Sequence, residues 1–218
     1  MQTIEIPQTV SFMKDNGNPG IEMTDTGSFT GYAARFLNID RQGDIIAPGA
    51  FSKAINEFMN AGGMVLADHQ NKTSSVVGTL RSAQEDSRGL LVNVGFSATQ
   101  TGQQIRQLMR EKAINYMSIG FIARPGVKIS EKQVNELWQK YGYQPSAEQK
   151  QLAKSGANLI KDVAEIFEVS VVPIPANKDA AIISVKGANH STSVDHLKPD
   201  LLALFERARA CDALLLNR

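Results

Sequence analysis

One histidine of this chain lies where a folded core would meet a surface. His190 and His196 flank a polar stretch with the composition of a linker, whereas His69 follows the apolar run 64–67 with only Asp68 between them. That run predicts a buried strand that emerges into a turn at His69. An unperturbed imidazole titrates near neutral pH, so His69 is the leading candidate for proton transfer.

A serine lies inside a second strand-like segment, 116–121. Alternation directs the apolar side chains at 117, 119 and 121 toward a core and places Ser118 and Gly120 on the opposite face. A glycine beside the hydroxyl leaves space for another backbone or a ligand to approach. Serine in a strand is most often a structural hydrogen-bonding residue, so this segment alone leaves a structural and a nucleophilic role open.

A glutamate, Glu168, interrupts the apolar strand pattern of residues 165–172. Burying an unpaired carboxylate is costly, and a histidine is a suitable partner because the acid can fix its tautomer. A water-facing edge position, or pairing with Lys161 or an arginine, is the alternative. Glu165 is the weaker acid candidate. Strict alternation divides the strand into one face with Phe167, Val169 and Val171 and another with Ile166, Glu168, Ser170 and Val172.

Together these residues supply a hydroxyl nucleophile, a base and an orienting acid. The candidate catalytic residues are therefore Ser118, His69 and Glu168. The sequence has no Gly-x-Ser-x-Gly elbow, which argues against an α/β-hydrolase. A metal-dependent hydrolase using His69, Asp68 and Glu168 is a poorer hypothesis, because the chain lacks a His-x-x-x-His pair and Cys ligands. We expect no metal and no cofactor. The residues alone indicate a serine hydrolase and no more.

Composition narrows the class of protein. The 218 residues are 42% hydrophobic and carry a net charge of +1, with no basic run that would favour a nucleic-acid partner. The single cysteine, Cys211, rules out an intramolecular disulfide framework. No stretch approaches the roughly 20 apolar residues of a membrane span, and the N-terminus lacks the blocks of a signal peptide. We expect a soluble protein of a reducing compartment.

Strand patterns dominate the first two-thirds of the chain, at 29–36, 76–80 and 89–96, with helical patterns opening near Pro48 and Thr101. Residues 130–157 turn polar and helix-forming, and a strand pattern resumes from 159 to 172. A linker at 187–196 and an amphipathic helix at 197–218 follow. Short strands interrupted by helices predict an α+β fold built on an antiparallel β-core.

Five blocks of the sequence follow one another in a characteristic order. They are 31–33 with 43–51; the His69 segment; Glu85-Asp86 with Gly89-Leu90; 117–121; and 168–172 with 175–177. Each block is weak alone, but five in register are specific. Through them the chain resembles the prohead (capsid-maturation) serine proteases of tailed bacteriophages, and the resemblance covers most of residues 28–183.

The resemblance implies a general base at His69 and a nucleophile at Ser118, and we place the third, acidic member at Glu168. It also implies a closed, mainly antiparallel β-barrel wrapped by helices, similar to the herpesvirus assembly proteases, over residues 1–186. The implied task is to cut scaffold protein or the scaffolding segment of the major capsid protein, and the protease itself, inside the immature prohead in the host cytoplasm. A homo-oligomer is compatible with this role.

Two departures from the family pattern stand out. Gln70 follows His69 where relatives often have Asp, and residues 130–157 resemble an insertion between the nucleophile and acid strands. Asp40 and Asp44 lie in a family block, where we expect a turn role rather than chemistry. The main alternative function is a non-catalytic capsid-assembly or scaffold protein that keeps the protease fold.

Overall fold

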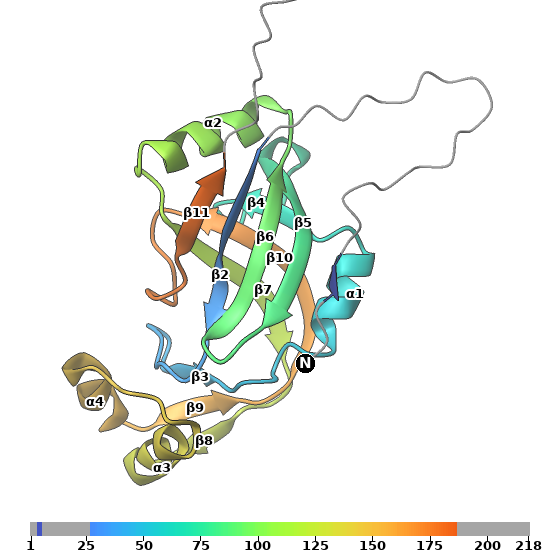
Figure 1. The fold of residues 1–218 in the computed structure, drawn as a ribbon. Helices are drawn as coiled ribbons and strands as arrows, with labels where there is room; N and C mark the ends of the chain where they lie inside the picture. The colour runs from blue at the N-terminus through green and yellow to red at the C-terminus, as the bar shows by residue number, and fades with distance from the viewer. Residues whose placement is uncertain (1–3, 6–26, 187–218) are drawn as a thin grey trace, which may run out of the picture. The chain divides into compact units, whose positions relative to one another are not determined.

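The structure is a computed structural model that describes residues 4–5 and 27–186 (Figure 1). Strands and helices alternate along these ranges, which confirms the α+β class. The expected linker at 187–196 and helix at 197–218 lie outside the described residues. No helix within the described ranges is long and apolar enough to cross a membrane. The elements are β1 (Ile4–Glu5), β2 (Ser28–Arg35), β3 (Asp44–Ile46), α1 (Ala54–Asn60), β4 (Met64–Ala67), the 3₁₀ helix η1 (Thr73–Ser75), β5 (Val76–Glu85), β6 (Gly89–Phe96), α2 (Gln100–Arg110), β7 (Tyr116–Ala123), β8 (Val127–Ile129), α3 (Glu131–Tyr141), α4 (Ala147–Ala153), β9 (Ala157–Ile160), β10 (Val163–Val172) and β11 (Ile182–Lys186).

The larger sheet brings the three candidate segments side by side. Its strand order is β11-β2-β6-β5-β4-β10-β7, and β1 pairs with β5. Neighbouring strands are antiparallel except β4 and β10, which run parallel. A parallel pair needs a long crossover, and here the crossover contains every element from β5 to β9. As a result β10 lies between β4, which precedes His69, and β7, which carries Ser118.

The expectation of a closed barrel is wrong, because the sheet is curled but open. The beginning of its end strand β7 meets the chain just before β11, the other end strand: the Met117 N–H donates to the Ala180 carbonyl at 2.9 Å, and an isolated bridge joins Tyr116 to Ala181. At Gly31 of β2 an added Cβ would lie 2.7 Å from the Met117 sulfur, so β2 approaches β7 closely. Figure 1 shows β7 oblique to β2. Strands that cross at an angle share a contact point rather than a hydrogen-bond ladder, and this leaves the sheet open.

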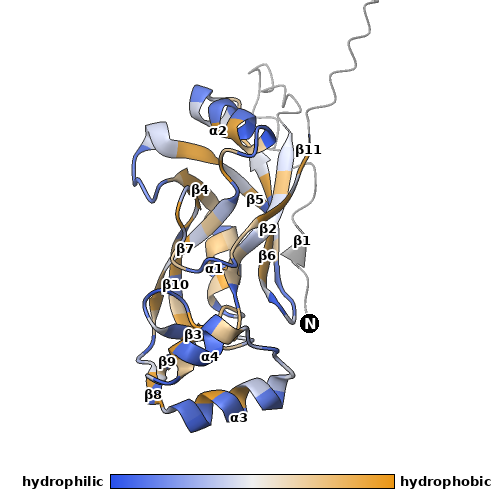
Figure 2. Cartoon of the chain, turned by 90° about the vertical axis from the view of Figure 1, so that its left-hand side faces the viewer, coloured by the Kyte–Doolittle hydropathy of each residue, from blue (hydrophilic) through white to orange (hydrophobic). Residues whose placement is uncertain are grey.

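Apolar side chains from the strands and from α1 form the core. The largest fully buried ones include Phe29, Phe51, Leu66, Leu90 and Met117. Helix α1 contributes a buried stripe of Ala54, Ile55, Phe58 and Met59, and it starts later than the helical pattern expected near Pro48. Figure 2 shows that α1 is more hydrophobic than α3 and α4, which are largely hydrophilic.

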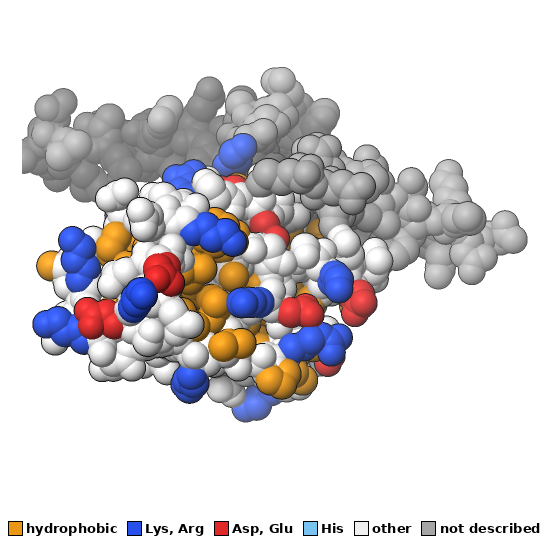
Figure 3. Space-filling model, turned by 90° about the horizontal axis from the view of Figure 1, so that it is seen from below, with side chains coloured by type: hydrophobic (Ala, Val, Ile, Leu, Met, Phe, Trp, Pro, Cys, Tyr) orange, Lys and Arg blue, Asp and Glu red, His pale blue; other side chains and the backbone are white. Residues whose placement is uncertain are grey.

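A second, three-stranded sheet of order β3-β9-β8 lies beside α3 and α4, which occupy the segment 130–157. The Trp138 indole of α3 donates to the Leu37 carbonyl at 2.7 Å. The Gln149 amide of α4 accepts the Ile39 N–H at 2.6 Å and donates to the Ile39 carbonyl at 2.9 Å. These buried bonds attach both helices to the chain that follows β2. Seen from below, exposed hydrophobic side chains are surrounded by charges of both signs (Figure 3).

The turn role expected for Asp40 is confirmed. Its Oδ1 accepts the N–H groups of Gln42 at 2.8 Å and Asp44 at 2.9 Å, an arrangement that stabilises a tight turn before β3. Burial raises the pKa of the Asp40 carboxyl, and these donors oppose the rise.

Candidate active site

His69 is presented by a turn with an unusual backbone. Asp68 and His69 have φ angles of 54° and 56°, both in the left-handed region, and the Gln70 N–H closes the turn on the Ala67 carbonyl at 3.0 Å. Positive φ at a residue other than glycine costs about 1–3 kcal/mol and persists only where the surroundings hold it. Here the Asp68 N–H donates to the Val171 carbonyl at 3.0 Å and the His69 N–H to the Ser170 hydroxyl at 3.2 Å. Both anchors lie on β10.

Glu168 is buried because β10 contains a bulge. Ile166 pairs with Phe121 and Glu168 with Gly120, so Phe167 is an extra residue without a partner on β7. The bulge overturns strict alternation: Ile166 and Val169 are both in the core, and Phe167, grouped by alternation with Val169, is 47% exposed. The Glu168 residue is only 7% exposed.

Gly120 makes room for this carboxylate. A Cβ at Gly120 would lie 2.3 Å from Glu168 Oε1 and 2.7 Å from the Phe167 ring. The space that the sequence analysis expected beside Ser118 is therefore filled by these two β10 side chains. Glycine at this position therefore leaves room for both the carboxylate and the ring beside β7.

The Glu168 carboxylate and the His69 ring form a hydrogen bond, with 2.7 Å between Oε1 and Nδ1. The acid is therefore partnered by histidine rather than by Lys161 or water. A carboxylate at Nδ1 favours the tautomer with its proton on that nitrogen, which leaves Nε2 as a proton acceptor. The imidazole side chain is 46% exposed, so an incoming group can reach it.

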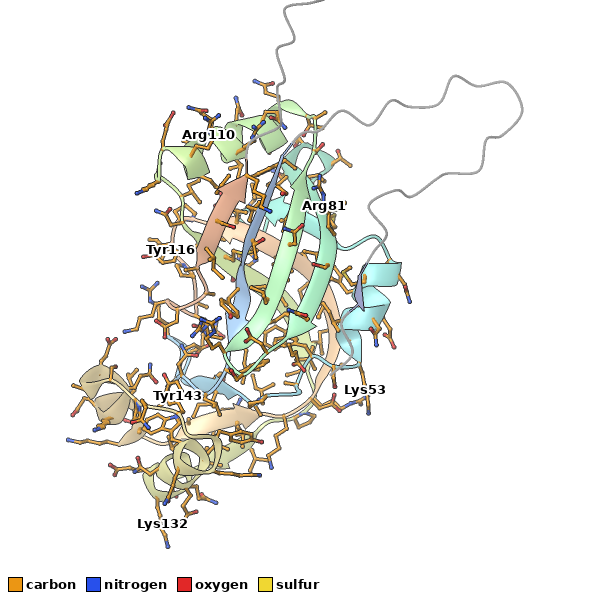
Figure 4. The ribbon with its side chains drawn as sticks, viewed as in Figure 1. Lys53, Arg81, Arg110, Tyr116, Lys132 and Tyr143 are labelled. Atoms are coloured by element: carbon orange, nitrogen blue, oxygen red, sulfur yellow. The ribbon has the colours of Figure 1, made fainter. Side chains whose placement is uncertain are left out.

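Ser118 lies in the middle of β7, on the face that also carries Gly120, and is directly opposite Ser170 of β10. Side chains in directly opposed positions have Cβ atoms about 4.5–5.5 Å apart. Because the Ser170 hydroxyl also contacts the His69 main chain, Ser118 and His69 lie on two sides of the same residue. No hydrogen bond joins the Ser118 hydroxyl to His69 among the described residues. The apolar side chains Met117, Ile119 and Phe121 pack against the core as predicted, and Tyr116 lies at the outer end of the strand (Figure 4).

Ser170 has no role predicted from the sequence, although strict alternation places it on the same face of the strand as Glu168. Ser170 is fully buried, and its hydroxyl donates to Glu168 Oε2 at 2.5 Å. A second polar residue two positions after a buried acid, in an otherwise apolar strand, is the signal that could have identified it.

The metal hypothesis would use Asp68 together with His69 and Glu168 as ligands. Within the described part of the chain, no three His, Cys, Asp or Glu side chains are grouped so that they could hold a metal ion. A pocket of about 490 Å³ lies elsewhere, and its lining does not include the three candidate residues. It is lined by residues 39–43, Glu148, Leu152, Ser155, Gly156, Ala176 and Lys178.

Residues in two other blocks of the resemblance form hydrogen bonds that join separate segments of the fold. Glu85 accepts the Phe51 N–H at 2.9 Å, and burial raises the pKa of its carboxyl. Asp86 accepts the Tyr32 hydroxyl at 2.6 Å; burial alone would raise the pKa of Asp86, but this bond and two backbone donors lower it. These blocks therefore have structural explanations that are independent of catalysis.

The sequence matches the model of the caudovirus prohead serine protease family over residues 17–196, and the chain belongs to that family. It is thus a peptidase of the class that acts in phage capsid maturation. One relative, the prohead protease of Enterobacteria phage HK97, is 28% identical over 191 residues, which cover 85% of this chain and 71% of that protein. Among solved structures, KSHV protease in complex with a hexapeptide phosphonate inhibitor gives a TM-score of 0.38 at 10% identity, covering 88% of this chain and 78% of that one.

Proposed function

We propose that the chain is a serine endopeptidase in which Ser118 is the nucleophile, His69 the general base and Glu168 the acid that orients the base. Its substrates are scaffold protein or the scaffolding segment of the major capsid protein, and the protease itself, inside the immature prohead in the host cytoplasm. The observation that supports this best is the hydrogen bond between Glu168 and His69 Nδ1 in a chain of this family. Glu168 is on β10, which pairs with β7, the strand that carries Ser118.

The chemistry would proceed by acyl transfer. His69 Nε2 takes the Ser118 proton while the Ser118 oxygen forms a bond to the peptide carbonyl carbon. The imidazolium, stabilised by Glu168, then gives that proton to the leaving amine as the peptide bond breaks. Water, activated by the same imidazole, attacks the acyl carbon. The ester bond to Ser118 breaks, the cleaved segment leaves as a carboxylic acid, and the serine hydroxyl is restored. The hydroxyl and imidazole must come within hydrogen-bond reach, and such bonds commonly tighten only when substrate is bound.

A non-catalytic scaffold protein with this fold would have no need for an activated hydroxyl, which gives a direct test. A fluorophosphonate reacts with an activated serine: the serine oxygen bonds to phosphorus, fluoride leaves, and the base accepts the proton. We expect one adduct, located at Ser118 by peptide mass spectrometry. Labelling should disappear in His69→Ala, which removes the base but keeps the serine.

The control for this labelling is Ser82, a partly exposed serine in the middle of β5. Ser82→Ala should be labelled at the wild-type rate. A wild-type chain that is not labelled at Ser118, or is labelled equally at several serines, would contradict the proposal.

Gly120→Ala tests the packing beneath the acid. The added Cβ would meet the ends of two side chains, the Glu168 carboxylate and the partly exposed Phe167 ring, and both can move, so we expect a folded protein whose carboxylate is displaced from His69. Misplacement of a catalytic group by about 1 Å can cost on the order of 10²-fold in rate. The rate of fluorophosphonate labelling measures this loss.

Gly95→Ala is a matched control, since its Cβ would meet only the far end of Arg81, 2.5 Å from Nε. Both variants should show similar thermal unfolding, and only Gly120→Ala should lose reactivity. Wild-type labelling of Gly120→Ala would mean that the position of the carboxylate does not matter.

A further inference from the structure

Ser170 connects two parts of the candidate site that lie on different strands. Its hydroxyl donates to Glu168 Oε2 at 2.5 Å and accepts the main-chain N–H of His69 at 3.2 Å. It is completely buried, so it cannot itself attack a substrate. A hydroxyl has one donor and two acceptor positions, and these contacts use the donor and one acceptor.

The Glu168 carboxylate is consequently held at both oxygens. Oε1 bonds to the His69 ring at 2.7 Å, and Oε2 bonds to Ser170. A carboxylate bound through one oxygen can rotate about its terminal bond, whereas one bound through both has a fixed plane. The fixed plane is what directs Oε1 at Nδ1.

The second hydrogen bond of the Ser170 hydroxyl, accepted from the His69 N–H, holds the histidine backbone. His69 has a φ of 56°, a conformation that requires support, and its N–H finds that support in the Ser170 hydroxyl. One buried side chain thus sets the position of the acid relative to the main chain that carries the base.

We propose that Ser170 is a positioning residue of the catalytic site, which holds the Glu168 carboxylate and the His69 turn in register so that His69 stays in the Nδ1–H tautomer. This inference rests on the proposed function for its catalytic meaning. The tautomer itself can be observed without any substrate.

The number of histidines makes the observation practical. The chain contains three, so ¹⁵N-histidine labelling gives few signals, and His69→Ala assigns the one from the site. We expect the wild-type His69 signal to report a proton on Nδ1. In Ser170→Ala this preference should be lost, and fluorophosphonate labelling of Ser118 should slow by about 10- to 100-fold, the scale of a misplaced catalytic group.

Two further variants separate positioning from a general packing role. Ser170→Thr keeps the hydroxyl and should restore the Nδ1–H signal. Ser28→Ala removes another buried strand serine, from β2, and should change neither the tautomer nor the labelling. A His69 tautomer and labelling rate in Ser170→Ala equal to those of the wild type would overturn the inference.

The experiment also keeps this inference distinct from the proposed function. A His69 signal that depends on Ser170 in a chain that never reacts at Ser118 would support the positioning contact and overturn the protease assignment. A Ser118 labelling rate and a His69 tautomer that do not change in Ser170→Ala would support the protease assignment and overturn the positioning role of Ser170.

Discussion

Ser118→Ala is expected to leave a folded chain that does not cut the capsid or scaffold protein of its phage. The residue is partly exposed in β7, and an alanine there removes one oxygen from a face that already contains Gly120. Loss of the nucleophile in a serine protease lowers kcat by on the order of 10⁶-fold. The measurement is processing of the substrate proteins on a gel after co-expression, together with the intact mass of the protease.

The intact mass tests self-cleavage in the same samples. If the protease cuts itself, the wild-type chain should lose mass and Ser118→Ala should stay intact. Ser82→Ala, from the middle of β5, should behave as the wild type in both assays. Complete substrate processing by Ser118→Ala would remove Ser118 from the mechanism.

Period-two alternation was reliable for β7 and failed for β10, for a physical reason. In β7 the pattern placed Met117 in the core and Ser118 on the other face, and the structure agrees. In β10 the bulge at Phe167 inserts a residue, so the two halves of the strand follow different registers. A bulge depends on pairing with the neighbouring strand, here across Gly120, and no pattern within β10 itself reveals it.

The free-energy cost of burying a carboxylate predicted the site better than period-two alternation did. A carboxylate in an apolar strand requires a partner, which predicted the pairing of Glu168 with His69, and Glu168 Oε1 lies 2.7 Å from His69 Nδ1. Their catalytic roles stay predictions. Two features depend on tertiary contacts that the sequence does not encode locally. One is the left-handed turn at Asp68 and His69, which is anchored on β10. The other is the open sheet edge, where β7 contacts only the chain just before β11.

Glu168→Gln should have the second-largest effect, because it preserves the shape of the side chain and reverses its hydrogen-bonding role. Ser170 donates to Oε2 and would select the amide oxygen at that position, which turns the amide NH₂ toward His69 Nδ1. The NH₂ group can only donate, so Nδ1 must accept and the ring proton moves to Nε2. An Nε2–H cannot take the Ser118 proton, and the equivalent change in other serine proteases lowers kcat by roughly 10⁴-fold.

The matched control is Glu165→Gln, which makes the same chemical change at an exposed position three residues earlier on β10. We expect Glu165→Gln to process substrate at the wild-type rate, while Glu168→Gln keeps a similar thermal unfolding midpoint and loses activity. The ¹⁵N signal of His69 should move to the Nε2–H form in Glu168→Gln alone. Activity within a few-fold of wild type would show that the buried acid has a structural role only, and would leave the base without an orienting partner.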